Sequence, residues 1–489
     1  MADTVRLTTV DGQRVEFLDK VAASGAMKDV YFSPDRSYVV ALFREQQDPQ
    51  ARDRLAMIAG PYRDGIFGQV GGNYWEEVFC WPTGVVEHAG RIGVVVPAYP
   101  PQFFFSHGSK NDDMLGIRGR EKEGKWFASA HNQNRFLDPR ERGHWLNYVR
   151  ICIRLARAVR RLHAAGLAHS DLSYKNALID LDGLVVPGKF PPDVVGTPDF
   201  IAPEVVMTAH LDRHDPARRL PSIATDRHAL AVLVYMYLLY RHPLRGDKVN
   251  DPDPQRDETL SMGERALFIE HPSDRSNRVR PELARASELP WKDTRKIPYR
   301  VTGPYLTPLF ERAFIDGLHK PGARPTADDW EHALVKTADL LQPCLNPDCA
   351  QGWYVFDNSF TPACPFCGTP FAGTLPILNF YSTRRGGQFT RDDHRLMVYT
   401  DQSLFPWHVR RNLAPNERLS AEDRRRVGYF VLHRDVWWLV NERLPGLHDL
   451  DQDAPVPIGD RVALTDGKRL LFSRDADARL AIVQLVTPR

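Results

Sequence analysis

The sequence predicts an α+β protein of several domains, and three observations support this prediction. The first hundred residues alternate short apolar runs with turns, as in "SYVVALF", which predicts a small twisted sheet. From residue 143 the apolar spacing becomes helical, and "ALAVLVYMYLLY" at 229–240 predicts a buried helix. After residue 376, short strand-like runs return between turn residues. A chain of 489 residues is also too long for one ordinary core.

The composition is that of a soluble globular protein, with 43% hydrophobic and 26% charged residues. The formal net charge of +2 gives no bulk electrostatic argument for a nucleic-acid or membrane partner, and we expect neither. The N-terminal stretch carries charges where a signal peptide needs an apolar run, and the apolar run at 229–240 is too short to span a bilayer. We therefore expect a cytoplasmic protein.

Two helices and one insertion can be placed from the pattern. An Asp-Pro start and helical spacing predict a helix in 48–64. The segment 143–170 predicts a long helix that Gly166 can end. Residues 245–300, rich in Pro, Asp and Arg, are predicted to form a surface insertion. One face of the long helix collects Tyr148, Cys152, Leu155, Val159 and Leu162.

A chemical motif follows the long helix in "HSDLSYKN", which has the spacing H-x-D-x-x-x-x-N. Phosphoryl transfer needs a carboxylate that orients and deprotonates a hydroxyl, metal ions on the phosphates and a cation beside them. Asp171 can supply the carboxylate, and Asn176 can ligate a metal ion. An ordinary polar turn could have the same letters, so the motifs that follow decide between the two.

Three further motifs follow in order. "GTPDFIAPEV" occupies 196–205, Asp226 begins the buried apolar helix, and "ARPTADDW" supplies Arg324 as a buried partner for Glu204. In this order they resemble the eukaryotic-type protein kinases over about residues 15–340. The resemblance implies a bilobal protein-kinase fold, with an N-lobe at 1–100 and a C-lobe at 101–340. It also implies ATP and Mg²⁺ or Mn²⁺ as cofactors and, from "GTPDFIAPE", serine or threonine of a protein substrate.

The resemblance assigns roles to residues of the nucleotide site. Asp182, in "DGL", stands where the family has its metal-binding aspartate, although the segment between Asn176 and Asp182 is shortened. Asp180 is the alternative ligand. The residues predicted to contact the nucleotide or its Mg²⁺ are Gly25, Lys28, Ala41, Asn176, Leu178 and Asp182.

The strand lysine of the family is missing, since "VALF" puts Phe43 in its place. Lys28 is the predicted substitute, because "ASGAMKDV" resembles the glycine loop of the with-no-lysine kinases, with Gly25 retained and a lysine at the third glycine. A solvated turn lysine is the alternative interpretation. Arg44 is the competing cation, but strand alternation turns it away from the site if Phe43 faces inward.

Two absences concern regulation. Ser170 replaces the arginine that reads a phosphorylated activation loop, and residues 182–196 contain no Ser, Thr or Tyr. Activation by phosphorylation of this loop is therefore not expected. The helix glutamate that pairs with the family's lysine is unassigned, because the expected region 63–69 contains only Asp64 as an acid.

Four of the six cysteines form the pattern C-x4-C, fourteen residues, C-x2-C. This spacing predicts a closed, structural zinc ribbon over 341–375, because four thiolates leave no position for water. A redox disulfide pair is the alternative. Cys80 and Cys152 are predicted to be buried core residues. The predicted ligands are Cys344, Cys349, Cys364 and Cys367.

The tail at 376–489 predicts a small all-β sandwich, and "VWWLVNE" with "VPIGDRVALTDGKRLLF" resembles forkhead-associated domains. Arg410, Arg411 and Asn412 are possible remnants of a phosphate grip, and we expect a protein-binding module. The order of kinase, ribbon and tail resembles bacterial kinases linked with tellurium-resistance systems. That resemblance implies a von Willebrand A-type protein and a metal-dependent phosphatase as partners.

The leading hypothesis is thus an ATP-dependent protein serine/threonine kinase that uses Lys28 and Asp171. A pseudokinase scaffold that binds nucleotide or partners without catalysis is the alternative. A small-molecule phosphotransferase fits less well, because such enzymes generally lack the "GTPDFIAPE" platform.

Overall fold

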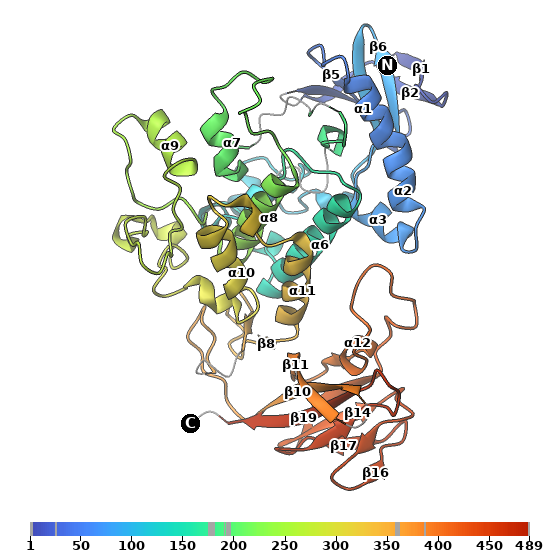
Figure 1. Cartoon of the computed structure of the whole chain (residues 1–489), viewed down its shortest axis with the longest axis vertical. Coiled ribbons are helices and arrows are strands. Elements are labelled where there is room, and N and C mark those ends of the chain that lie inside the picture. The colour runs from blue at the N-terminus through green and yellow to red at the C-terminus, as the bar shows by residue number, and fades with distance from the viewer. Residues whose placement is uncertain are drawn as a thin grey trace. The chain divides into compact units, whose positions relative to one another are not determined.

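The structure is a computed structural model (Figure 1), and its chain divides into two compact units. The first unit comprises residues 1–143, 151–299 and 308–331, and the second comprises 144–150, 300–307 and 332–489. None of the helices described is long and apolar enough to cross a bilayer. The described residues are 3–24, 27–174, 181–189, 191, 197–356, 362–385 and 388–487.

The first unit begins with an antiparallel sheet of order β3-β4-β5-β7-β6. On one face, Val15 and Phe17 of the β1–β2 hairpin pack against Tyr31 and Val40. Runs of β-branched residues build the central strands, as the sequence predicts. The strands are β1 (Thr4–Thr8), β2 (Arg14–Leu18), β3 (Val21–Ser24), β4 (Lys28–Phe32), β5 (Tyr38–Phe43), β6 (Gly84–His88) and β7 (Arg91–Pro97).

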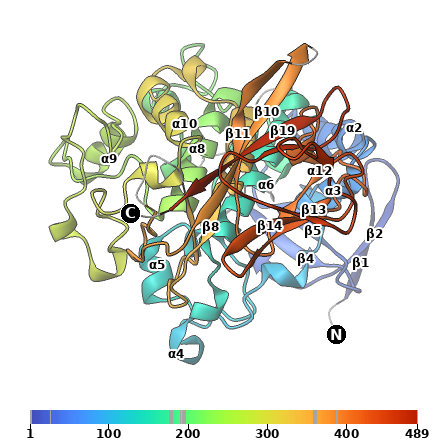
Figure 2. The ribbon, with the colours of Figure 1, turned by 90° about the horizontal axis from the view of Figure 1, so that it is seen from below.

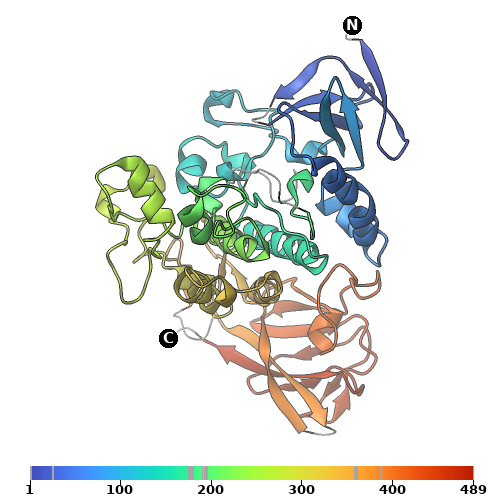
Figure 3. The same cartoon turned by 45° about the horizontal axis from the view of Figure 1, so that its top comes forward.

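A helical stretch covers the other face of this sheet (Figures 1 and 3), where Leu55 packs with Ala41, Phe43 and Val94. This stretch confirms the helix predicted in 48–64. Pro61, which lacks a backbone N–H, lies in its π-helical turn. The stretch consists of α1 (Ala51–Met57), the π-turn Ile58–Tyr62 and α2 (Arg63–Phe67), and α3 (Gly72–Val78) follows.

The chain that follows contains two long helices, α6 and α8. α6 (Trp145–Ala164) ends near Gly166, whose φ of +77° suits a glycine cap. α8 (Ile223–Leu239) begins with a capping box between Ser222 and Thr225 and is buried almost throughout. Both helices confirm the predictions from apolar spacing. The α6 residues predicted on one face are all buried, namely Tyr148, Cys152, Leu155, Val159 and Leu162.

The segment 245–300 lies only in part at the surface. Arg241, just before it, donates to the Glu270 carboxylate, and both side chains are buried. Phe268 and Tyr299 pack edge to face and are buried, so part of the segment belongs to the core of the first unit. The other helices of the described chain are α4 (Lys110–Asp113), α5 (Ala130–Arg135), α7 (Pro203–Thr208), α9 (Pro254–Met262), α10 (Thr307–Glu311) and α11 (Ala327–Ala338).

The second unit contains two antiparallel sheets, of order β11-β10-β19-β18-β15-β16 and β12-β13-β14-β17 (Figure 2). One apolar cluster, which includes Phe380, Leu439 and Val483, takes residues from both sheets, so the sheets form a sandwich as predicted. β8 (Leu341–Pro343) and β9 (Trp353–Val355) form a separate hairpin. The sandwich strands are β10 (Leu375–Arg385), β11 (Gln388–Met397), β12 (Ser403–Leu404), β13 (Gly428–His433), β14 (Val436–Asn441), β15 (His448–Asp449), β16 (Ala454–Pro455), β17 (Arg461–Ala463), β18 (Arg469–Leu471) and β19 (Arg479–Val486), and the short helix α12 is Pro406–Val409.

Candidate functional site

The loop that carries the H-x-D motif is fixed from below by a buried carboxylate. Asp226, in the first turn of α8, accepts a hydrogen bond of 2.7 Å from the backbone N–H of His169. The ring nitrogen Nε2 of His163, at the end of α6, lies 3.0 Å from the same oxygen. Asp226 is 2% exposed, so these partners compensate the burial of its charge. Asp226 thus joins the first turn of α8 to the loop that carries the H-x-D motif.

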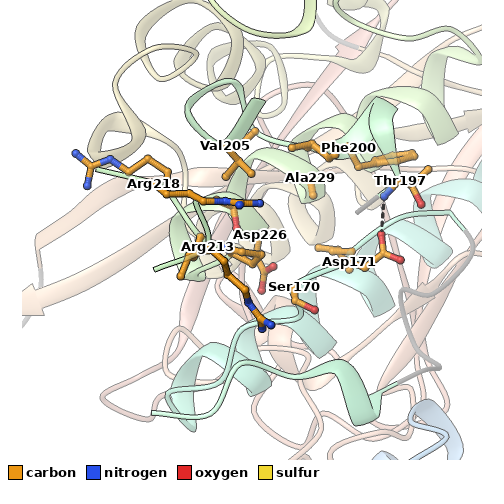
Figure 4. Close-up of a pocket in the computed structure, with 16 residues that line it drawn as sticks. Ser170, Asp171, Thr197, Phe200, Val205, Arg213, Arg218, Asp226 and Ala229 are labelled. Atoms are coloured by element: carbon orange, nitrogen blue, oxygen red, sulfur yellow. Dashed lines mark hydrogen bonds between the residues drawn. The ribbon is translucent and has the colours of Figure 1, made fainter. Parts of the chain in front are cut away.

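Asp171 lies at the rim of a cavity and has a defined orientation. Its Oδ1 accepts a hydrogen bond of 2.9 Å from the backbone N–H of Thr197 (Figure 4). Ser170 beside it adopts a φ of +43°, and its hydroxyl donates to the carbonyl of Gly183 at 2.6 Å. A left-handed conformation is costly for a serine, and this hydrogen bond offsets part of that cost. Ser170, which stands where the family that the sequence resembles has an arginine, therefore joins the loop to the "DGL" segment.

Lys28 and Asp182 meet although 154 positions separate them in the chain. The Nζ of Lys28 lies 3.0 Å from Oδ1 and 2.9 Å from Oδ2 of Asp182. Their side chains are 18% and 5% exposed, so the pair is largely withdrawn from water. Lys28 is also the direct cross-strand neighbour of Phe43, and its ammonium lies 5.4 Å from the centre of that ring. The structure thus brings together the two charged residues that the sequence predicted for the nucleotide site.

Arg44, the competing cation, is held elsewhere. Its Nε donates to Oδ1 of Asp29 at 2.8 Å, and Arg91 donates to the other oxygen of the same carboxylate at 2.8 Å. Hydrogen bonds from Ser24, Arg44 and Arg91 lower the pKa of Asp29 to about 2, against a smaller effect of burial. Arg44 therefore belongs to a charged cluster with Asp29 of β4 and Arg91 of β7.

Several predicted site residues lie outside the described residues, namely Gly25, Asn176, Leu178 and Asp180. Ala41 is 5% exposed and belongs to the apolar cluster between the sheet and α1. Asp64, the acid noted for the helix position, has a side chain that is 78% exposed and lies 4.0 Å from Arg63. Asp53 on α1 accepts from Lys189 at 3.2 Å. The structure therefore gives neither helical acid as the partner of Lys28.

The predicted pair between Glu204 and Arg324 is present and bidentate. The two terminal nitrogens of Arg324 lie 2.8 and 2.7 Å from the two carboxylate oxygens of Glu204. Arg324 is 1% exposed and also donates to the carbonyls of Ala224, Gly317 and Leu318. A buried guanidinium with this many acceptors fixes the "APE" segment to the first turn of α8 and to residues 317–318.

A cavity of about 80 Å³ opens beside Asp171 (Figure 4). Phe200, Ile201 and Val205 from the "GTPDFIAPEV" segment form its apolar side. Three arginines outside the sequence motifs also line it, namely Arg213, Arg218 and Arg219. The run of basic letters in "RHDPARRL" is the only sequence signal for them, and such a run alone predicts a solvated loop.

The four predicted ribbon cysteines converge in the second unit. Their sulfur atoms all lie within 4.8 Å of one another, with Cys344 and Cys367 at 3.5 Å and Cys349 and Cys364 at 3.9 Å. Gly352 and Gly368 follow the two cysteine segments with φ of +62° and +77°; the Gly352 carbonyl accepts from the Cys344 N–H, and the Gly368 N–H donates to the Cys364 carbonyl. This donor set can hold a metal ion, and four thiolates suit Zn²⁺.

The thiols differ in acidity. Burial raises the pKa of Cys364 and raises that of Cys344 to about 11. For Cys367, burial acts in the same direction, but hydrogen bonds with Thr369 outweigh it and lower the pKa to about 6. Cys152 is fully buried in α6 as predicted, whereas Cys80 is only partly buried and contacts the carbonyl of Pro97.

The candidate phosphate grip of the tail is occupied by other contacts. Arg410 pairs with Asp477 at 3.0 Å, and Arg411 donates to the carbonyl of Thr383 at 2.9 Å. Asn412 is exposed. The contacts of Arg410 and Arg411 therefore indicate structural roles in the sandwich.

Comparison with known proteins gives a limited similarity to protein kinases. No protein-family model matches the chain. The death-associated protein kinase dapk-1 of Caenorhabditis elegans is 34% identical over 131 residues, which is 24% of this chain and 8% of that protein. The kinase domain of the Toxoplasma gondii specific rhoptry antigen, a solved structure, matches with a TM-score of 0.34 and 14% identity, over 55% of this chain and 84% of that chain.

Proposed function

We propose that the protein is an ATP-dependent protein kinase that phosphorylates serine or threonine of a partner protein. The observation that carries this proposal is the contact between the Lys28 ammonium and the Asp182 carboxylate, 2.9 Å apart and largely buried. It unites a cation and a carboxylate that a with-no-lysine kinase needs for its nucleotide phosphates, although Phe43 occupies the usual lysine position.

Asp171 is the proposed catalytic base. It would accept the proton of the substrate hydroxyl while that oxygen bonds to the γ-phosphorus of ATP, and the bond between the γ-phosphorus and its bridging oxygen breaks to release ADP. The hydrogen bond from the Thr197 N–H orients its carboxylate. Asp226 positions the same loop through the His169 N–H, so the proposed base rests on a rigid support.

Mg²⁺ or Mn²⁺ would bind at Asp182 and Asn176. The Asp182 oxygens are hard ligands of the type these ions prefer, and their burial favours charge pairing. Mg²⁺ would neutralise charge on the transferred phosphate. Lys28 would then interact with the phosphates, close to its position beside Asp182.

Further parts of the proposal concern regulation and partners. The Ser170 hydroxyl bridges to Gly183, so the loop is joined to the "DGL" segment without a phosphate-reading arginine. Activation-loop phosphorylation would therefore be unnecessary.

We also propose that the cysteine ribbon is a structural Zn²⁺ site, and that ribbon and sandwich recruit partners such as a von Willebrand A-type protein and a metal-dependent phosphatase.

Transfer of labelled γ-phosphate to a generic protein acceptor tests the proposal, with Mg²⁺ and with Mn²⁺. Wild type should transfer label, and Asp171→Ala and Lys28→Met should each lose at least about a hundredfold in rate. Lys20→Met, an exposed lysine near the same sheet, should keep the wild-type rate. Absence of transfer by wild type with either metal would contradict the proposal.

One observation favours a second candidate, a pseudokinase scaffold. Lys28 occupies both oxygens of Asp182, the proposed metal ligand, so the ion pair must rearrange before a metal ion can bind there. A scaffold would bind labelled nucleotide, or a partner, without hydrolysis or transfer. Equilibrium nucleotide binding measured beside the transfer assay separates the two candidates.

A further inference from the structure

The cavity beside Asp171 has an unequal charge distribution. Asp171 and Asp226 are the acids that line it, and Arg213, Arg218 and Arg219 supply three positive charges. Asp226 is engaged by the His169 N–H and faces His163, and Asp171 accepts from Thr197. Arg218 and Arg219 thus place positive charge on the wall of the same cavity that Asp171 lines.

The three arginines lie on the loop between α7 and α8, and hydrogen bonds position them there. Arg213 donates to the carbonyl of Pro191 at 2.5 Å, and Arg218 donates to the carbonyl of Leu211 at 2.7 Å. The backbone N–H of Arg219 donates to Thr208 at the end of α7. Within the part of the chain that the structure describes, neither Arg218 nor Arg219 forms an ion pair. Their positive charge is therefore available to a ligand.

We propose that this cavity selects a peptide with acidic side chains beside the phosphate acceptor, an inference that rests on the proposed kinase function. Figure 4 shows Arg213 and Arg218 on the side of the cavity away from Asp171, Thr197 and Phe200. A peptide that presents its hydroxyl to Asp171 would therefore extend neighbouring side chains toward the arginines. Carboxylates and phosphates both match a guanidinium fork.

The apolar side of the cavity favours a peptide over a free anion. Phe200, Ile201 and Val205 offer contact area that inorganic phosphate cannot use. A volume of about 80 Å³ admits a side chain and not a folded surface. The ligand class is therefore an extended acidic segment of a protein, with carboxylate and phosphoserine as the two sources of negative charge.

The experiment uses the full chain and four serine peptides that differ only in the residues flanking the acceptor: Asp, phosphoserine, Gln or Lys. Transfer from ATP gives kcat/KM, and fluorescence anisotropy of labelled peptides gives binding without catalysis. The variants are the double substitution Arg218→Gln/Arg219→Gln and its charge-retaining form Arg218→Lys/Arg219→Lys. Arg14→Gln, at an exposed position on β2, removes a positive charge far from the cavity in sequence and serves as control.

Wild type should prefer the Asp or phosphoserine peptide over the Gln peptide in both measurements. The double Gln variant should lower that preference about fivefold, because it removes the two positive charges that would pair with the flanking carboxylate or phosphate, while the Lys form keeps both charges. A stronger response to phosphoserine would identify phosphorylated segments as the substrate, and equal responses would identify negative charge alone.

The two proposals fail in different ways. Transfer without an acidic preference, or with a preference that the double Gln variant leaves intact, would overturn the acidic-peptide inference and keep the kinase. Arginine-dependent binding of acidic peptides without transfer would keep the cavity's ligand class and overturn the kinase. Loss of both readouts would overturn both.

Discussion

Lys28 and Phe43 face each other across β4 and β5, and the Lys28 ammonium lies 5.4 Å from the centre of the Phe43 ring. Directly opposed residues in a sheet have Cβ atoms about 5 Å apart. A cation moved from one position to the other therefore remains within reach of the same ligand. Under the proposed kinase function, Lys28 on β4 would thus take the place of a cation at Phe43 on β5.

Because Lys28 and Phe43 are directly opposed, we predict that a lysine at position 43 can replace the one at position 28. Lys28→Met should reduce phosphate transfer by at least about a hundredfold, since the phosphate charge loses its partner. Adding Phe43→Lys in the same chain should restore about a tenth or more of the lost rate. The rate of label transfer at saturating ATP checks this. Arg44→Met should leave the rate within about twofold of wild type, because Arg44 is committed to Asp29. A double variant no better than Lys28→Met would show that Lys28 acts differently.

The buried Arg324 predicts a large stability effect. Arg324→Ala leaves the Glu204 carboxylate and three backbone carbonyls without their donor, so unfolding should become easier by about 3–5 kcal/mol. Arg312, whose side chain is 44% exposed and 3.4 Å from Asp329, is the matched control. Arg312→Ala should cost less than about 1 kcal/mol. Urea unfolding followed by tryptophan fluorescence measures both, and equal shifts of the midpoints would contradict the assignment.

The cysteine cluster predicts one tightly held zinc ion per chain. Cys364→Ser should remove it and lower the melting temperature of the second unit by roughly 10 °C, because several kcal/mol are lost and each shifts melting by about 2–4 °C. Metal content by atomic spectroscopy and a thermal scan check the prediction. Cys152→Ser, in the buried face of α6, removes a thiol and should leave the zinc content unchanged. Purified protein without zinc, and insensitive to chelators, would favour the redox alternative.

The sequence predicts well those elements whose residues act locally. The face of α6 that ends with Leu162 and the apolar run of α8 follow from helical spacing, and the structure buries both. Ordered motifs also predict distant contacts when the partners belong to the same pattern, as for Glu204 and Arg324. The spacing of the four cysteines likewise predicts that their sulfur atoms lie close together, and the structure places them within 4.8 Å of one another.

The sequence predicts less where irregular backbone carries the contacts. Phe268 and Tyr299 lie in a segment without apolar periodicity, yet both are buried, because turns and short 3₁₀ pieces bring them into the core. Arg218 and Arg219 have no spacing that links them to Asp171. Only the fold of the loop after α7 brings them to the same cavity.

The burial of His242 predicts that the free energy of unfolding decreases as the pH falls. His242 accepts from the Leu244 N–H through Nδ1, and its Nε2 lies 2.8 Å from the Asp199 carbonyl, an arrangement that suits a neutral ring. Burial lowers the pKa of His242 to about 4, and the nearby Asp199 opposes this only in part. Because the folded-state pKa lies below the unfolded value of 6.5, the unfolded chain takes up the proton first as pH falls. The folded state should therefore lose up to about 3 kcal/mol between pH 6.5 and about pH 4.

Urea midpoints measured between about pH 7 and about pH 4.5 should fall with pH in wild type and fall less in His242→Gln, which cannot titrate. His228, buried in α8 with neither ring nitrogen hydrogen-bonded among the described residues, has a pKa lowered by burial and should add to the wild-type slope. His210→Gln removes an exposed imidazole and should leave the slope unchanged. If His242→Gln keeps the full wild-type slope, His242 is not held neutral by its burial.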